Sequence, residues 1–167
     1  TRAVESVSGT RLGRDADKDE SSAPSISADG RYVAYESNHD DIDFSDTNRK
    51  VDVFVYDRIE DSTRRISSSY DRVDEVAKAS TNPAISSDGR FVAFESVSSK
   101  MVEGDLNELS DVFVKDLVNN TMTLKSITVD GMQGNGSSTA PAISSDGKVV
   151  SFQSRATNLD PLDSDSS

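Results

Sequence analysis

Cysteine is absent from this sequence of 167 residues, and its absence removes several kinds of chemistry. A chain without thiols has no disulfides, no thiolate metal sites and no cysteine nucleophile. Histidine occurs once, as His39, so a zinc site of imidazole and thiolate ligands is excluded as well. No serine lies in a Gly-x-Ser-x-Gly elbow, the turn that presents a hydrolase nucleophile. We expect His39 to be solvated, because it lies in a polar loop without a catalytic partner.

Long hydrophobic runs are also missing. Apolar residues make up 34% of the chain and aromatic residues only 6%, and they come in short clusters. No run approaches the length that spans a bilayer, so we expect no membrane insertion. The sequence opens at TRAVESVSG without a signal segment, from which we expect a leader or an earlier domain to precede it. At this length the clusters suffice for one domain with a core.

Basic residues are outnumbered, since 18 Lys and Arg stand against 30 Asp and Glu, for a net charge of −12. A surface of this sign repels phosphate backbones and anionic lipids and attracts divalent cations. We therefore expect no nucleic-acid partner. Carboxylate pairs are too numerous in so acidic a chain to single out a glycosidase site, and no glycine-rich phosphate loop stands between a strand and a helix.

Three copies of one motif dominate the sequence. They read PSISADGRYVAYES at 24–37, PAISSDGRFVAFES at 83–96 and PAISSDGKVVSFQS at 141–154. The first two copies agree at ten of fourteen positions, and the copies are spaced 59 and then 58 residues apart (83 − 24 and 141 − 83). A period near sixty without a helical pattern predicts a propeller blade or a β-solenoid.

Each repeat is expected to fold as four strands. A short first strand leads into a tight Asp-Gly hairpin turn with positive φ angles, and RYVAYES forms the second strand. VFVY and VFVK are apolar at consecutive positions, which predicts third strands covered on both faces. Turns at 60–61 and 119–120 then lead to a fourth strand, which holds Arg65 and Ile66 in one copy and Ile127 in the next. Four antiparallel strands per repeat describe a propeller blade.

The motif Pro-x-Ile-Ser-x-Asp-Gly-Arg-x-Val-Ala-Phe resembles the repeat of TolB-like β-propellers, also found in prolyl-oligopeptidase-type peptidases. Its fuller form, with Asp-x-Asn before Asp-Val-Phe-Val-x-Asp, resembles repeats of large exported bacterial proteins. The resemblance implies an all-β partial propeller of about three four-stranded antiparallel blades, in a secreted or periplasmic protein. The expected boundaries are a last strand and link of a preceding blade at 1–20, blades at 21–79 and 80–137, and the first half of a further blade at 138–167.

Oxygen-bearing side chains recur before the third strand of each repeat, and they make these loops candidate calcium sites. The candidate ligands are Asp46, Asn48 and Asp52, then Asp105, Asn107 and Asp111, and a third copy begins at Asp163 and Asp165. Oxygens at alternate positions of a tight loop resemble the first half of an EF-hand. The backbone carbonyls of Lys50 and Leu109 could complete the arc of ligands.

The alternative is that these side chains only cap turns by accepting backbone amide hydrogens. Arg49 and Glu108 stand where a calcium loop prefers glycine or a third acid, which favours turn capping. Asp57 and Asp116 lie about 16 Å further along the strand, too far to bind the same ion. However, a turn needs only one such side chain, and each loop has three at the same spacing. Both interpretations therefore remain open.

Two functions are compatible with the sequence. The lack of a repeated or converging catalytic set favours a non-catalytic binding or spacer module with a protein or carbohydrate partner, stabilised by calcium if the loops bind it. The alternative is the propeller portion of a larger enzyme, such as a prolyl-oligopeptidase-type peptidase, whose catalytic domain lies elsewhere.

The strand count predicts an incomplete propeller. One last strand, two sets of four and two further strands give eleven (1 + 4 + 4 + 2). Closed propellers use about four to eight blades. We therefore expect either that the remaining blades of a larger propeller, six-bladed as in TolB-like proteins, complete the structure or that copies associate edge to edge.

Overall fold

The computed structural model describes residues 7, 20–43, 46–70 and 78–160. Within these ranges the chain forms ten β-strands and no helix, and hence no helix that could cross a membrane. The strands are β1 Ser21–Ile26, β2 Tyr32–Ser37, β3 Asp52–Asp57, β4 Ser62–Arg65, β5 Ser80–Ile85, β6 Phe91–Ser96, β7 Asp111–Asp116, β8 Thr121–Leu124, β9 Ser138–Ile143 and β10 Val150–Ser154. The all-β prediction is confirmed.

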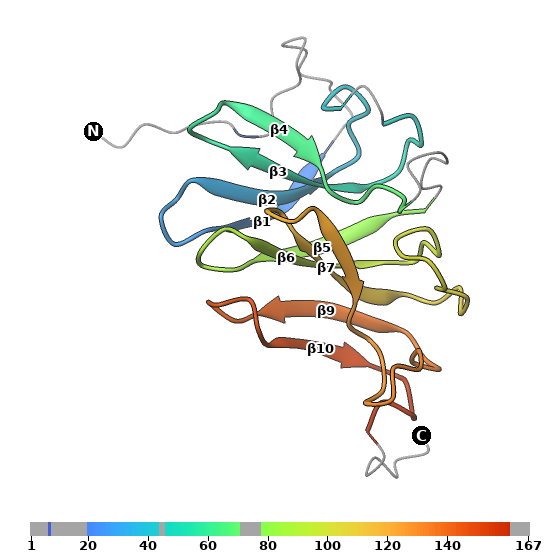
Figure 1. The fold of residues 1–167 in the computed structure, drawn as a ribbon. Helices are drawn as coiled ribbons and strands as arrows, with labels where there is room; N and C mark the ends of the chain where they lie inside the picture. Colours follow the sequence, from blue (N-terminus) through green and yellow to red (C-terminus); the bar gives the residue numbers. More distant parts are fainter. Residues whose placement is uncertain (1–6, 8–19, 44–45, 71–77, 161–167) are drawn as a thin grey trace.

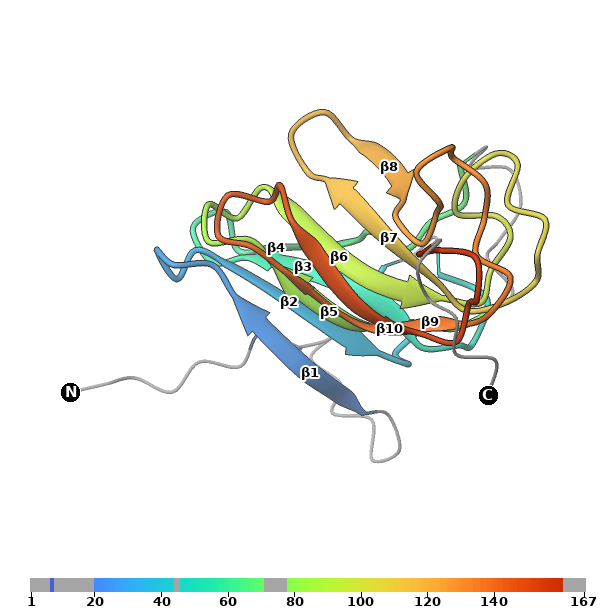
Figure 2. The ribbon, with the colours of Figure 1, turned by 90° about the horizontal axis from the view of Figure 1, so that it is seen from below.

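The strands form three antiparallel sheets, which are stacked one above another in Figure 1. β1 to β4 form the first blade and β5 to β8 the second, each in sequence order, and β9 pairs with β10 in a third. Figure 2 shows β2, β6 and β10 running in similar directions. Strands that pair in sequence order give the up-and-down arrangement of a propeller blade. The strand expected before β1 falls in residues 1–20, almost all outside the described ranges.

Each blade opens with the same hairpin turn. Asp29 Oδ1 accepts hydrogen bonds from the Ser27 hydroxyl (2.6 Å) and the Arg31 amide (3.0 Å), which closes the turn. Gly30 takes a φ of 72°, a conformation that costs little only without a Cβ. The second and third blades repeat the arrangement, with glycine φ angles of 72° and 71°. The predicted turn is confirmed, although only the glycine has a positive φ and the aspartate does not.

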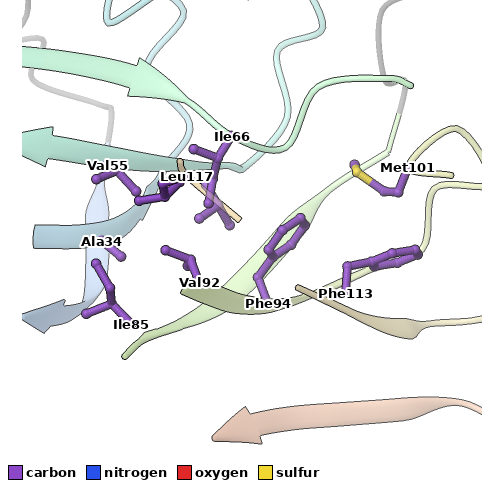
Figure 3. Packing of buried hydrophobic residues seen from close by; sticks show 10 residues of the cluster. Ala34, Val55, Ile66, Ile85, Val92, Phe94, Met101, Phe113 and Leu117 are labelled. Carbon is purple, nitrogen blue, oxygen red and sulfur yellow. The ribbon is translucent and has the colours of Figure 1, made fainter. Parts of the chain in front are cut away.

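The third strand of each complete blade is buried on both faces, as its consecutive apolar residues predict. β3 and β7 each bury five of their six residues. One face contributes to the core between the first two blades, where Val55 and Ile66 lie together with Val92 and Phe94 (Figure 3). The other face of β3 places Phe54 in a second cluster. Full burial of such a side chain contributes about 1.5–3 kcal/mol, so these strands anchor the fold.

Neighbouring blades meet at a repeated set of contacts, which we name the blade junction. One part of it is an aromatic ring laid against the turn glycine of the next blade. Tyr32 lies against Gly89, and Phe91 lies against Gly147. A Cβ added to either glycine would come within 2.4 Å and 2.1 Å of the ring, respectively, so only glycine fits. The turn glycine therefore serves both the hairpin and the packing of the blades.

The second part of the junction is a glutamate that accepts a backbone hydrogen bond from the next blade. Glu36 Oε2 accepts from the Asn82 amide (2.8 Å), and Glu95 Oε2 accepts from the Ala140 amide (2.6 Å). Asn82 and Ala140 have left-handed φ angles of 54° and 52° and lie where the strand register shifts. The bulge takes these amides out of the strand ladder, and the glutamates satisfy them.

The fourth strand is shorter than the sequence predicts. β8 ends at Leu124, and Ile127 lies beyond it in an isolated bridge. The Ser126 hydroxyl accepts the hydrogen bond of the Val112 amide (3.1 Å), which a strand carbonyl would otherwise take. This bond ends the ladder, so the placement of Ile127 in the fourth strand was wrong. Ile66 likewise follows the end of its strand, although it is buried in the core.

Candidate functional site

The candidate loops lie on one side of the blade stack, together with the link between β8 and β9 (Figure 1). In the second blade, the loop between β6 and β7 contacts the link between β8 and β9 directly. The Gln133 amide donates to Asp105 Oδ1 (2.9 Å), and the Asn107 amide donates to the Gly134 carbonyl (3.2 Å). These two segments therefore lie side by side at one rim of this blade.

The asparagines shape the turn in both loops. Asn48 Oδ1 accepts a hydrogen bond from the Lys50 amide (2.6 Å), and Asn107 Oδ1 accepts one from the Leu109 amide (2.9 Å). The residue after each asparagine is left-handed, with φ angles of 55° and 56°. This is the geometry that turn capping predicts. Because each asparagine oxygen already accepts a backbone amide, a metal site in these loops depends first on the aspartates.

The first loop has a cation of its own between its aspartates. Asp46 and Asp52 are buried, and Arg65 Nη1 lies 3.2 Å from Asp46 Oδ1 and 3.5 Å from Asp52 Oδ2. Asp52 also accepts hydrogen bonds from the Asn48 amide (2.7 Å) and the Ser67 hydroxyl. Burial, together with the charge of Asp52, raises the pKa of Asp46 to about 6, and Arg65 opposes this rise. The guanidinium thus compensates the aspartate pair from within the fold only in part.

The second loop has the same aspartates without such a cation. Asp105 and Asp111 are buried, and Leu124 takes the place of Arg65 in the strand pairing. Asp111 Oδ1 accepts a hydrogen bond from the Ser126 hydroxyl, whereas its buried Oδ2 has no hydrogen-bond partner among the described residues. Burial raises the pKa of Asp111 and the charge of Asp105 reinforces this rise, whereas the Ser126 hydroxyl and the Asn107 amide oppose it. Among the described residues, this loop therefore buries negative charge with neutral donors but no cation beside it.

The aspartates at the far ends of the third strands have partners of their own. Arg31 donates three hydrogen bonds of 2.7–3.1 Å to the carboxylate of Asp57, and Arg90 donates three of 2.8–3.3 Å to Asp116. These bonds hold the pKa of Asp57 at about 2 and lower that of Asp116 well below its usual range. Both pairs join the hairpin turn to the end of the third strand.

The remaining predicted ligands, Asp163 and Asp165, lie outside the described residues. Within the described part of the chain, no group of three or more His, Asp and Glu side chains could hold a metal ion. A metal site there would have to draw on amide or backbone oxygens as well. His39 is buried, so the expectation that it is solvated is wrong. The loop after β2 packs against the blade and buries Ile42 and Asp46 as well.

A hollow of about 310 Å³ lies between the segment after β4 and the second blade. Serine hydroxyls line it together with Tyr70, Met101, Glu103 and Lys115. Its described lining offers one acid and one base but no histidine, so it has the character of a small binding hollow.

Solved structures resemble this chain, whereas no protein-family profile and no curated protein matches it. A putative TolB from Agrobacterium tumefaciens is 19% identical, with a TM-score of 0.52, and the match covers 82% of this chain and 39% of that one. The chain has a TolB-like β-propeller fold.

Two further propellers have lower TM-scores. TolB from Acinetobacter baumannii is 16% identical, with a TM-score of 0.46, over 82% of this chain and 29% of its own. The β-propeller domain of the Trilobed protease from Pyrococcus furiosus is 18% identical, with a TM-score of 0.49, over 80% and 34%. The chain spans less than two fifths of the length of each of these structures. Its two four-stranded blades and one two-stranded sheet, with the likeness to the Agrobacterium TolB, agree with the prediction of a partial propeller.

Sequence reasoning missed Arg65, Leu124 and Gln133 as parts of the candidate site. The exchange of an arginine for a leucine at positions 59 residues apart (124 − 65) is visible when the repeats are aligned. Gln133 gave no comparable signal, because it lies in a link whose sequence differs from that of the preceding one.

Proposed function

We propose that this chain belongs to a non-catalytic β-propeller module of an exported bacterial protein, where it serves as a binding or spacer element. The partners of the repeated polar residues support the proposal. Ser27 and Asp29 build the turn, Arg31 pairs with Asp57, and Glu36 joins the next blade. Side chains engaged in this way do not serve proton transfer or nucleophilic attack. The repeating motif is accounted for by folding rather than by catalysis.

A protein or carbohydrate is the partner that the surface favours. The net charge of −12 repels nucleic acid, and the hollow beside Tyr70 offers a half-exposed aromatic ring next to hydroxyl groups. An aromatic body with polar neighbours suits a sugar or a polar peptide. Export is supported by the resemblance of the Asp-x-Asn repeat to repeats of exported bacterial proteins.

Incubation of the chain with panels of peptides and polysaccharides tests the non-catalytic proposal. We expect no product. The core variant Phe94→Ala is the control, because it is expected to lose about 3–5 kcal/mol of folding free energy. Turnover by the native chain that this variant loses would overturn the proposal. A Gly-x-Ser-x-Gly segment downstream in the gene would instead favour the propeller of a peptidase.

A glycan array and a peptide array test the binding proposal. We expect retention of at least one ligand class and weaker retention by Tyr70→Ala. The matched control is Val129→Ala, since Val129 is exposed and lies away from the hollow. If neither array retains the native chain, the spacer interpretation replaces the binding one.

A further inference from the structure

The two candidate loops differ at one position that sets their charge. β3 pairs with β4 so that Phe54 lies opposite Arg65, and β7 pairs with β8 so that Phe113 lies opposite Leu124. Arg65 and Leu124 therefore occupy the same place in two blades whose loop aspartates match.

In the first blade, Arg65 marks the point on which both aspartates converge. Its Nη1 atom is within 3.5 Å of a carboxylate oxygen of Asp46 and of Asp52. The arginine side chain is only 5% exposed, and both aspartate side chains are fully buried. The guanidinium nitrogen is thus a cation built into the fold, held by charge-assisted contacts.

Among the described residues, the corresponding carboxylates of the second blade have neutral partners. Asp105 Oδ1 accepts a hydrogen bond from the side-chain amide of Gln133, and Asp111 Oδ1 accepts one from the hydroxyl of Ser126. Asp111 Oδ2 is buried and has no donor at hydrogen-bond geometry among the described residues, although the Asn107 amide still favours its ionised form; in the first blade the Asn48 amide bonds Asp52 Oδ2 directly. Asp46 Oδ2 of the first blade is buried without a donor as well, but its carboxylate faces Arg65. No Lys or Arg of the described ranges forms an ion pair with Asp105 or Asp111. Two neighbouring buried carboxylates of this kind require a proton or a bound cation.

We propose that Asp105 and Asp111 bind one calcium ion, at the place that Arg65 Nη1 takes in the first blade. The Gly134 carbonyl accepts the Asn107 amide beside the pair and offers a third oxygen. Calcium accepts irregular shells of about six to eight oxygens that water completes, whereas magnesium demands a near-octahedral shell. With two charged ligands, we expect a Kd of about 0.1–1 mM, as in extracellular modules. The inference does not depend on the binding or spacer role.

The test is a calorimetric titration of the chelator-stripped chain with calcium chloride near pH 7, together with thermal melts. The native chain should bind calcium and should melt at a higher temperature in about 10 mM calcium than in chelator, and magnesium should do neither. Asp111→Asn should weaken binding by about tenfold or more, because it removes one of two charged ligands. Its melting temperature in chelator should equal or exceed that of the native chain, because the unpaired charge is gone. Asp52→Asn, the matched change in the first blade, should leave calcium affinity unchanged.

A second variant imitates the first blade. Leu124→Arg supplies the built-in cation and should abolish the calcium response. If this variant does not fold, Asp111→Asn decides alone. No heat and no change in melting temperature for the native chain would overturn the proposal and indicate a proton shared by the pair. A calcium response that Asp111→Asn retains would also overturn it, since the ion would then bind elsewhere.

Discussion

Within the described repeats, aspartate recurs at three kinds of position, and each gives the carboxylate a different charge environment. In the hairpin turn, the Ser27 hydroxyl and the Arg31 amide lower the pKa of Asp29. At the strand end, Arg31 holds the pKa of Asp57 at about 2. In the loop, burial raises the pKa of Asp46 to about 6. Ionisation therefore stabilises the fold at the first two positions and opposes it at the third.

These opposite shifts predict maximal stability in mild acid. As the pH falls from about 4 through about 2, Asp57 loses the ionised form that the folded state favours, so the free energy of unfolding falls. As the pH rises from about 4 through about 6, Asp46 loses a proton that the folded state binds more tightly than the unfolded state does. The free energy of unfolding therefore falls on this side as well. Urea denaturation across this range measures both limbs. In Asp46→Asn, the decline above about pH 4 should shrink by on the order of 1–3 kcal/mol, and an unchanged decline would contradict the assignment.

Gly30 and Gly89 provide a matched pair for measuring the blade junction. Both have a φ of 72°, but only Gly89 faces a ring. Gly30→Ala should cost about 1 kcal/mol from backbone strain alone, because the nearest atom to the new Cβ is 3.7 Å away, on Arg58. Gly89→Ala should cost about 1–3 kcal/mol more, because the new Cβ would lie 2.4 Å from the Tyr32 ring. Urea denaturation gives both values. Equal costs would show that the ring moves aside freely. In a Tyr32→Ala background, Gly89→Ala should cost no more than Gly30→Ala does, because the ring that the new Cβ would meet is gone.

Among the elements, β2 and β6 each pair within their own blade and also hold the next one. Glu95 in β6 satisfies the Ala140 amide that the bulge of β9 leaves out of the ladder. Glu95→Ala should lower the free energy of unfolding by about 0.5–1 kcal/mol, because it removes a hydrogen bond that water replaces only in part at this exposed amide. Glu95→Gln should retain most of the stability, since an amide oxygen can still accept. Urea denaturation distinguishes the two, and equal losses would mean that the contact depends on charge.

The elements were predictable from sequence where their signals are local. The Asp-Gly pairs fixed the hairpin turns, and the consecutive apolar residues of VFVY and VFVK marked strands buried on both faces. The end of β8 was not predictable, because it depends on the Ser126 hydroxyl reaching Val112 in the neighbouring strand. Ile127 has a strand-like side chain, but that contact ends the ladder before it.

The candidate loops were also visible in the sequence, from the spacing of Asp and Asn. The difference between them was not, because it depends on side chains that arrive from other elements. Arg65 reaches Asp46 across the pairing of β3 with β4, and Gln133 reaches Asp105 from the link to the next blade. Spacing identifies the carboxylates, but their compensation depends on tertiary contacts.

At the scale of the whole molecule, the blade stack has two unlike ends, and within the described residues each lacks a partner found at the internal junctions. On the first blade, Ile26 is 59% exposed and no aromatic ring lies against Gly30 within the described structure. On the third, Val149 occupies the position of Tyr32 and Phe91 in the repeat and is 64% exposed. The exposed turn of the first blade and the exposed Val149 of the third blade thus correspond to the two sides of an internal junction.

We expect this chain in isolation to associate end to end, because such contacts cover both apolar faces. Light scattering should report a mass that rises with protein concentration. Val149→Lys should reduce the association, since it places a charge on the face. Val129→Lys, at an exposed position in the link between β8 and β9, is the control. A monomer at all concentrations with a cooperative melt would contradict the expectation and favour a self-contained β-architecture.

The repetition of the blade junction also has a mechanical consequence. Pulling on the two ends of the chain would load the junctions in series, and rupture of one would leave the next intact. A released blade would free its repeat of 59 residues, about 200 Å of chain at roughly 3.4 Å per residue. The force–extension curve would be a sawtooth, with tooth spacing set by the repeat period and tooth height by the rings and glutamates at each junction. Such a chain lengthens in steps under tension and dissipates work at each one.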